Sequence, residues 1–150
     1  MSRTRRGKSS VTVDPSDIAS RHGHASCLLC GRENPLSLGL SFRPVDNDSV
    51  VADYRPPSVL QGYDGIVHGG MAAALLDAAM THCLFHHGIR ALTGGLHVRY
   101  KKPIPIETTV EIKARLILSK PPLYRLRAEI VRNDCLFASA EADFFRWSSP

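Results

Sequence analysis

Apolar residues dominate one continuous stretch of the chain. Residues 70–87 read GMAAALLDAAMTHCLFHH, and Gly88 follows as a helix-ending signal. A helix of this composition has no polar face, so it is buried on all sides rather than lying on a surface. The sequence therefore predicts a central helix that other elements cover.

Alternating patterns typical of strands follow this helix. Four runs qualify: 92–101, 109–119, 123–132 and 136–147. In the first of them, Leu96 and Val98 alternate with His97 and Arg99. The dipeptides Lys-Pro, Pro-Pro and Asn-Asp mark turns between the runs, and strands joined by short turns pair antiparallel. The pattern predicts an antiparallel sheet.

The part of the chain before the central helix is less regular. Asp14 and Pro15 form a helix-start signal for a short helix, with Asp14 as its N-cap. Two short strands are predicted at 38–43 and 49–54. Residues 55–67 then form a long connection, rich in proline and glycine, of the kind that is often functional in a compact domain.

Together these elements predict an α+β fold in which a curved antiparallel sheet wraps one long helix. The 150-residue chain is long enough for one domain with a core, and its 43% apolar and 22% charged residues exclude disorder throughout. We expect a single domain over residues 14–150, preceded by a disordered basic tail over residues 1–13. Four basic residues within the first eight account for much of the net charge of +5.

No apolar run reaches the roughly 18 residues of a membrane span, and no signal-peptide core follows the basic start. The sequence therefore predicts a cytoplasmic protein without a membrane partner.

The start of the central helix carries the first candidate chemistry. Val67-His68-Gly69-Gly70 opens the helix, where main-chain N–H groups lack partners and the helix dipole is positive. Glycines let a ligand approach such donors closely. A tight turn that needs glycine explains the pair equally well, and the pattern alone leaves both interpretations open.

Asp77 adds a carboxylate to this helix. It lies seven residues past Gly70 in an otherwise apolar run, where an unpaired charge costs several kcal/mol. Thr81 is four residues further and shares its face, so it is a candidate to orient the carboxylate. Oxyanion donors and a carboxylate are the parts needed for acyl transfer to water, with Asp77 as general base or nucleophile.

Three longer motifs resemble a known family. They are residues 61–77 (QGYDGIVHGGMAAALLD), residues 93–104 (TGGLHVRYKKPI) and residues 27–40 (CLLCGRENPLSLGL). Together they resemble hotdog-fold thioesterases of the phenylacetyl-CoA thioesterase type, in which an HGG turn leads into a helix with an acidic residue. The resemblance covers roughly residues 24–147.

The resemblance implies an acyl-CoA thioesterase with the hotdog fold. Two chains would pair, and two dimers would often pair again, with the active site at the dimer interface. Asp77 of one subunit would face the oxyanion-binding Gly69 N–H of the other, with His68 beside it. Thr93 falls where related enzymes carry a hydroxyl that helps to position the water, and Gln61 falls near a polar residue that polarises the thioester carbonyl.

Substrate contacts are expected from a wider set of residues. Cations suited to the phosphates of coenzyme A, together with two helix residues, make up this set: Gly70, Thr81, Arg99, Lys101, Lys102 and Lys120. No cofactor is expected beyond the coenzyme A of the substrate. The strand period does not fix the side on which Thr93 lies, because Gly94-Gly95 is a candidate β-bulge.

Cysteine and histidine residues offer a possible metal site. Cys27-x-x-Cys30, with His22 and His24 nearby, has ligand types that zinc prefers. All four lie within nine residues, whereas zinc sites usually draw on two separated pairs. The sequence therefore favours a loop packed on the sheet, with no metal.

Other functions fit the pattern less well. An acyl-CoA hydratase requires a second acid–base group, which the sequence does not offer in a matching position. A zinc-dependent nucleic-acid binder leaves the buried helix unexplained, and we expect no nucleic-acid partner. The main alternative is a non-catalytic acyl-CoA-binding regulatory protein with the same fold. The acyl group, the oligomer size and the exact role of Asp77 stay open.

Overall fold

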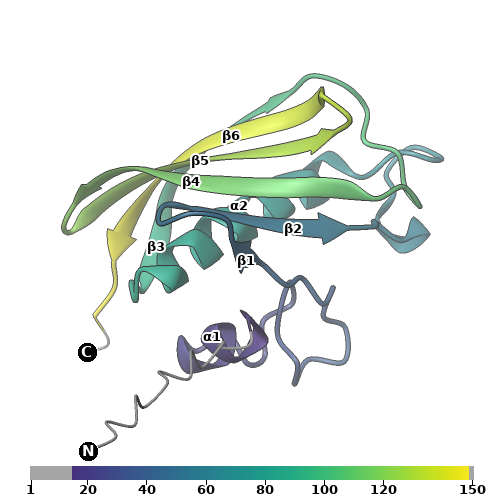
Figure 1. Ribbon diagram of the computed structural model, residues 1–150. Coiled ribbons are helices and arrows are strands. Elements are labelled where there is room, and N and C mark those ends of the chain that lie inside the picture. The colour runs from purple at the N-terminus through teal and green to yellow at the C-terminus, as the bar shows by residue number, and fades with distance from the viewer. Residues whose placement is uncertain (1–14, 149–150) are drawn as a thin grey trace, which may run out of the picture.

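The structure is a computed structural model that describes residues 15–148, and Figure 1 shows a curved sheet arching over a long helix. Six antiparallel strands run in the order β1-β2-β4-β5-β6-β3. The strands are β1 (Arg43–Pro44), β2 (Ser49–Tyr54), β3 (Ala91–Tyr100), β4 (Val110–Lys120), β5 (Leu123–Arg132) and β6 (Cys135–Arg146). The helices are α1 (Pro15–Arg21), the 3-10 helix η1 (Ser58–Leu60) and α2 (Gly69–His86).

The α+β architecture, the central helix and the four long strands are confirmed. The first short strand, predicted at 38–43, is wrong except at its end, because β1 contains only Arg43 and Pro44. The reason lies in the backbone: the N–H groups of Leu38 and Leu40 donate to carbonyls of the preceding loop rather than to the sheet. The expected tail and the Asp14 cap lie outside the described residues.

The core lies between the concave side of the sheet and α2. Inward residues of the central strands alternate with outward ones, and Tyr124, Leu126 and Ile130 of β5 have no exposed surface. From the helix, Leu75 and Leu76 are equally buried. Each such side chain contributes about 1.5–3 kcal/mol through its removal from water.

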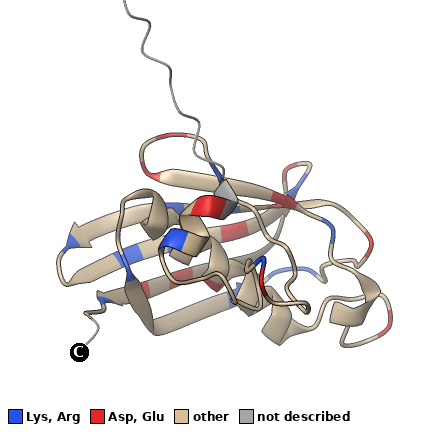
Figure 2. Cartoon of the chain, turned by 90° about the horizontal axis from the view of Figure 1, so that it is seen from below, with Lys and Arg blue, Asp and Glu red and all other residues tan. Residues whose placement is uncertain are grey.

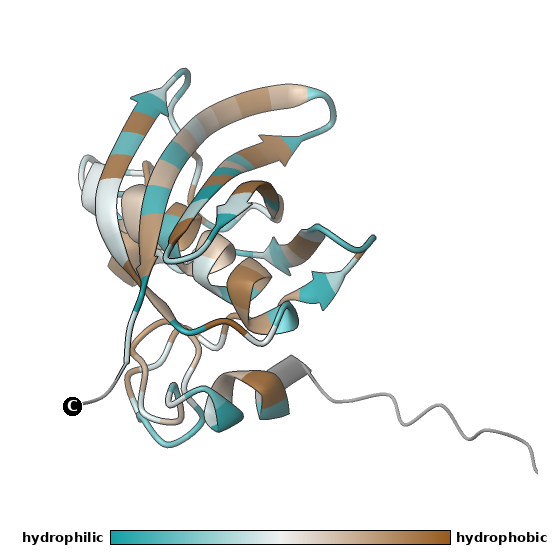
Figure 3. Cartoon of the chain, turned by 90° about the vertical axis from the view of Figure 1, so that its left-hand side faces the viewer, coloured by the Kyte–Doolittle hydropathy of each residue, from teal (hydrophilic) through white to brown (hydrophobic). Residues whose placement is uncertain are grey.

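The N-terminal segment covers part of the opposite side of α2, as Figures 1 and 3 show. The ring of His22 stacks on Phe85 of α2 with 4.8 Å between centroids, and Phe42 lies against His82 at the same distance. Burial lowers the pKa of His82 to about 3, so this ring is neutral. The loop after α1 therefore packs on the helix, and the prediction that it packs on the sheet is wrong.

One stripe of α2 stays partly open in the single chain. Ala74, Asp77 and Thr81 are half-buried and are spaced three and four residues apart, so they share a helix face. This face lies beside β3, the edge strand of the sheet. The prediction of a helix buried on all sides is thus wrong for this stripe.

A β-bulge in β3 decides which residues face the helix. Thr93 pairs with Phe144 and Leu96 pairs with Ala142, with a register shift between Thr93 and Gly95. Both β6 partners point into the core. Because a one-residue shift reverses the facing of a strand, the bulge places Thr93 on the same side as Leu96. The candidate bulge at Gly94-Gly95 is confirmed.

Charged residues of both signs are interspersed over the strands (Figure 2). On the outer face of the sheet, Arg125 pairs with Asp143 at 2.7 Å and Arg127 pairs with Glu141 at 2.8 Å. The hydrogen bond from Arg125 holds the pKa of Asp143 below its usual value. None of the helices within residues 15–148 has the length and apolar character needed to cross a membrane.

Candidate active site

The start of α2 is organised by the side chain of His68. This residue is the N-cap, and its Nδ1 accepts a hydrogen bond from the Gly70 N–H at 2.9 Å. A Cβ on Gly70 would lie 3.1 Å from the same Nδ1, which is tighter than ordinary contact. A side chain on Gly70 would therefore crowd the cap, and the Gly70 N–H is already engaged.

Gly69 differs from its neighbour in both respects. Among residues 15–148, no group accepts a hydrogen bond from the Gly69 N–H. The atoms nearest to a Cβ built on Gly69 would be those of the Tyr100 side chain, at an ordinary 3.6 Å. The packing of the single chain does not demand a glycine here, and the free donor lies at the positive end of the helix dipole.

Tyr100 braces this helix start from β3. Its hydroxyl donates to the Gly69 carbonyl at 2.6 Å, although the side chain is 55% exposed. No role for this residue was expected from the sequence. The alternation of inward and outward residues along β3 could have indicated it, because this alternation places Tyr100 on the helix side together with Leu96 and Val98.

Asp77 also contacts β3, at a residue on the other side of the β-bulge from Tyr100. The Thr93 hydroxyl donates to Asp77 Oδ1 at 2.6 Å, a short distance typical of a hydrogen bond to a charged acceptor. This bond leaves Oδ2 for another partner. Thr81 lies one helical turn further along the same face, but the hydrogen bond that orients the carboxylate comes from Thr93.

Gln61 lies in the connection between η1 and α2. Its side-chain Oε1 accepts from the Gly65 N–H at 3.1 Å, and a β-bridge joins Gln61 to Val67. These bonds fold residues 61–67 into a compact turn beside the helix start. The carbonyl end of the side chain is thus occupied by the loop, and the amide end remains as a donor on an exposed residue.

A pocket of about 350 Å³ lies beside the helix start. Its lining combines apolar side chains, the first helical glycine and two cations: Tyr63, Ile66, Val67, Gly69, Ala72, Tyr100, Lys101, Lys102, Pro103 and Ile104. Two of the four expected phosphate-binding cations, Lys101 and Lys102, therefore lie with Gly69.

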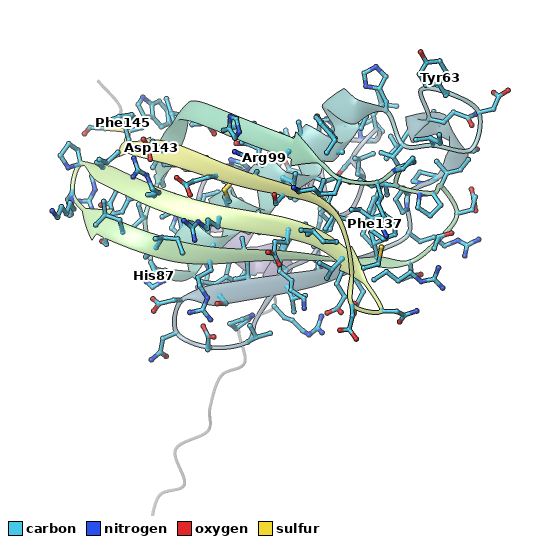
Figure 4. All side chains as sticks on the ribbon, turned by 90° about the horizontal axis from the view of Figure 1, so that it is seen from above. Tyr63, His87, Arg99, Phe137, Asp143 and Phe145 are labelled. Atoms are coloured by element: carbon cyan, nitrogen blue, oxygen red, sulfur yellow. The ribbon has the colours of Figure 1, made fainter. Side chains whose placement is uncertain are left out.

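The other two expected cations lie elsewhere. Arg99 is on the outer face of the sheet, in a groove that also contains Asp143, and Figure 4 labels both residues. Lys120 is the last residue of β4. Across the sheet it lies in one row with Leu123 of β5, Phe145 of β6 and Leu92 of β3. The four cations do not form one cluster in the single chain.

The predicted site residues thus form two groups. One surrounds the helix start and contains His68 and Gly69, which Tyr100 joins from β3; the other contains Asp77 and Thr93. Gly69 and Asp77 are eight residues apart on α2, which corresponds to about 12 Å of helical rise. A single chain does not bring the two groups to one reacting atom.

Comparisons with known proteins agree with the fold. The family model described as thioesterase superfamily matches residues 64–135, which include Gly69, Asp77 and Thr93. The acyl-coenzyme A thioesterase THEM4 of Rattus norvegicus is 42% identical over 57 residues, which cover 38% of this chain and 24% of that protein. The chain thus matches only about a quarter of the length of this relative.

Solved structures extend the likeness over most of the chain. A phenylacetic acid degradation-related protein from Ralstonia eutropha JMP134 is 25% identical with a TM-score of 0.65, covering 72% of this chain and 85% of that one. Zebra fish thioesterase superfamily member 2 has a TM-score of 0.73 at 17% identity, covering 91% of this chain and 100% of that one. The architecture is therefore the expected hotdog fold, and residues 64–135 are similar to the thioesterase superfamily.

Proposed function

We propose that this chain hydrolyses an acyl-coenzyme A thioester to a free acid and coenzyme A, in an active site that a second copy of the chain completes. The observation that carries this proposal is the pair of groups on α2: a carboxylate oriented by Thr93 and a helix-start N–H without a partner in the described chain. They are the two components that thioester hydrolysis requires.

The Gly69 N–H is suited to an oxyanion. When water or a carboxylate attacks the thioester carbonyl, negative charge develops on the carbonyl oxygen, and a fixed donor at a helix start stabilises it. Gly69 has room for a side chain within its own subunit, yet carries none. A bare backbone at this point lets the carbonyl oxygen approach the N–H closely.

Asp77 is suited to activate the attacking group. The Thr93 hydroxyl fixes Oδ1, so Oδ2 is presented in a defined direction. As a general base, Asp77 takes a proton from water while the water oxygen adds to the thioester carbonyl carbon. The C–S bond of the tetrahedral intermediate then breaks, and the proton passes to the departing thiolate of coenzyme A. As a nucleophile, Asp77 adds to the carbonyl carbon and expels coenzyme A as a thiolate, which takes a proton from solvent. Water then hydrolyses the acyl anhydride to the free acid and the Asp77 carboxylate. Both routes use the same carboxylate.

The edge strand explains how two copies bring these groups together. Tyr100 contacts Gly69 at one end of β3, and Thr93 contacts Asp77 near the other end, roughly 20 Å away along the strand. Antiparallel pairing of β3 with its copy about a two-fold axis places the Thr93 end of one chain beside the Tyr100 end of the other. Each dimer then contains two complete sites.

The surface of β3 supports this pairing. It is a ten-residue edge strand with one side unpaired in the sheet order, and such edges pair readily with another chain. Leu92, Leu96 and Tyr100 are 57%, 40% and 55% exposed on it. A second copy would cover these side chains together with the open stripe of α2, and a dimer of dimers is the larger assembly that we propose.

Coenzyme A recognition is proposed at the pocket beside the helix start. Lys101 and Lys102 line this pocket with Gly69, so cations suited to phosphate lie next to the proposed oxyanion site. Gln61 presents amide donors from the adjoining loop, where they would polarise the thioester carbonyl. The chemistry uses groups of the chain and the coenzyme A that the substrate carries.

The test is thiol release from a panel of short, long and aromatic acyl-CoA esters. We expect turnover of at least one ester by the wild type, and a loss of about 100-fold or more in Asp77→Ala. The matched control is Asp53→Ala, an exposed carboxylate on β2 whose one ion pair within residues 15–148 is with Arg43. Binding of the esters without release by the wild type would instead support the non-catalytic acyl-CoA-binding protein.

A further inference from the structure

The loop after α1 brings together three side chains that the proposed reaction does not use. The ligand atoms of His24, Cys27 and Cys30 lie within 4.8 Å of one another, and Cys30 Sγ is 3.6 Å from His24 Nδ1. In a tetrahedral site with Zn–S near 2.3 Å and Zn–N near 2.0 Å, a sulfur and a nitrogen ligand are about 3.5 Å apart. The contact therefore has the spacing of two ligands on one ion.

We propose that His24, Cys27 and Cys30 bind a zinc ion that holds the loop after α1 in the conformation in which it packs on helix α2. The sequence argued against a metal because all the ligands come from one short stretch. The structure shows a turn that the spacing of the ligands along the sequence does not reveal. The Cys27 N–H donates to the His24 carbonyl at 3.1 Å, so a tight turn brings the histidine back over the cysteines.

The backbone around the cysteines is shaped to make their sulfurs converge. The Leu29 N–H donates to Cys27 Sγ at 3.3 Å, and the Gly31 N–H donates to the Cys27 carbonyl at 2.8 Å. A Cβ on Gly31 would lie 2.3 Å from the Cys27 nitrogen, so the chain closes around the first cysteine with no space for a side chain. N–H groups directed at sulfur stabilise a metal-bound thiolate and fix its orientation.

A second observation points to the same place. His82 of α2 is only 2% exposed, and its Nε2 has no hydrogen-bond partner within residues 15–148. Buried polar atoms almost always have a partner. The His82 ring meets the His24 ring edge-on, with 6.5 Å between centroids. The unpartnered His82 ring therefore lies next to one of the proposed ligands, and a water molecule fills the fourth coordination position.

The ligand set selects zinc among the common ions. Two thiolates and an imidazole suit zinc, whereas calcium and magnesium prefer oxygen ligands. Two thiolates also neutralise the charge of the ion, which suits a half-buried site next to apolar Phe85. The ion would thus have a structural role. It would fix the conformation of residues 24–30, which pack on the part of α2 that follows Asp77.

Metal content provides the first test. The full chain is prepared without a polyhistidine tag, reduced, exposed to excess zinc, desalted and measured by mass spectrometry of the metal. We expect one zinc per chain in the wild type and its loss in Cys27→Ser and in His24→Asn. The matched control Cys135→Ser, outside the cluster, keeps its zinc. Equal zinc content in Cys27→Ser and the wild type would overturn the proposal.

A cobalt titration of the wild type keeps the proposal testable if the variants fold poorly. Binding at the cysteines gives thiolate-to-cobalt charge-transfer absorption together with the visible bands of a tetrahedral ion. A reduced chain that shows neither overturns the proposal, including the case in which Cys27 and Cys30 form a disulfide instead. Because thiol release from acyl-CoA is measured separately, failure of the metal site and failure of the thioesterase function give different results.

Discussion

At the scale of single residues, two hydroxyl groups of β3 hold the candidate site. Thr93 donates to Asp77, and Tyr100 donates to the Gly69 carbonyl, both at 2.6 Å. Neither hydroxyl needs to react in the proposed step. Each fixes the position of a group that does, so their loss should lower the rate constant more than it raises KM.

Thr93→Val removes the hydroxyl and keeps the shape of the side chain. A hydrogen bond to a charged group contributes about 1.5–3 kcal/mol, so kcat should fall roughly 10- to 100-fold. Steady-state kinetics on the best acyl-CoA ester would measure this change. Thr93→Ser, which keeps a hydroxyl, should recover most of the rate, and equal activity of the valine and serine variants would show that the bond to Asp77 is unimportant.

Gly69→Pro tests the proposed oxyanion donor directly. Gly69 is the first residue of α2, where proline is well tolerated because that N–H has no helical partner. The preceding His68 has φ −56° and ψ 133°, which is compatible with a following proline. Loss of one oxyanion donor should lower kcat about 100- to 1000-fold.

Gly69→Ala serves as the matched comparison, because it keeps the N–H and its Cβ makes only ordinary contact with Tyr100. Circular dichroism and thermal melting would establish that both variants fold. A proline variant as active as the wild type would remove the Gly69 N–H from the mechanism.

At the scale of elements, the tight loop at Gly31 makes a stability prediction. A Cβ there would lie 2.3 Å from the Cys27 nitrogen and 2.5 Å from the Ala25 carbonyl, and neither backbone atom can move aside easily. Gly31→Ala should therefore lower the free energy of unfolding by about 2–4 kcal/mol, as measured by urea denaturation. Gly95→Ala, with nothing within 4 Å of the added Cβ, should change it by much less.

Helices and strands were predictable from the sequence where a regular pattern of apolar residues extends over a long stretch. Helix α2 and strands β3 to β6 follow from continuous or alternating apolar runs, and the HGG turn and Asp77 stand out against them. Local signals failed where hydrogen-bond partners decide the outcome. Residues 38–42 have strand character, yet the N–H groups of Leu38 and Leu40 bond to the preceding loop.

The same limit applies inside the candidate site. The facing of Thr93 depends on a register shift that one sequence period cannot show, because a single extra residue reverses the side. The proximity of His24 to the two cysteines depends on a turn, and ligand spacing along the chain pointed the other way. The side on which Thr93 lies and the proximity of His24 to the cysteines both depend on the three-dimensional path of the backbone, which the sequence pattern does not show.

At the scale of the whole molecule, the separation of Gly69 and Asp77 along one helix determines what the assembly must do. About 12 Å of rise separates them, and a reacting carbonyl needs both within hydrogen-bond reach. One chain therefore contributes the carboxylate and another the oxyanion donor to each proposed site. This division of labour makes a prediction that a site within one chain does not share.

Two inactive variants should restore each other when they are combined. Asp77→Ala keeps the Gly69 donor, and Gly69→Pro keeps the carboxylate, so a mixed dimer contains one intact site and one doubly defective site. Random pairing of equal amounts gives about half mixed dimers, and therefore about a quarter of wild-type thiol release. Co-expression with two different affinity tags isolates the mixed species, in which half of the wild-type activity is expected. A mixed dimer as inactive as its parents would mean that both groups of each active site come from the same chain. Catalysis would then not require the pairing of β3 with its copy.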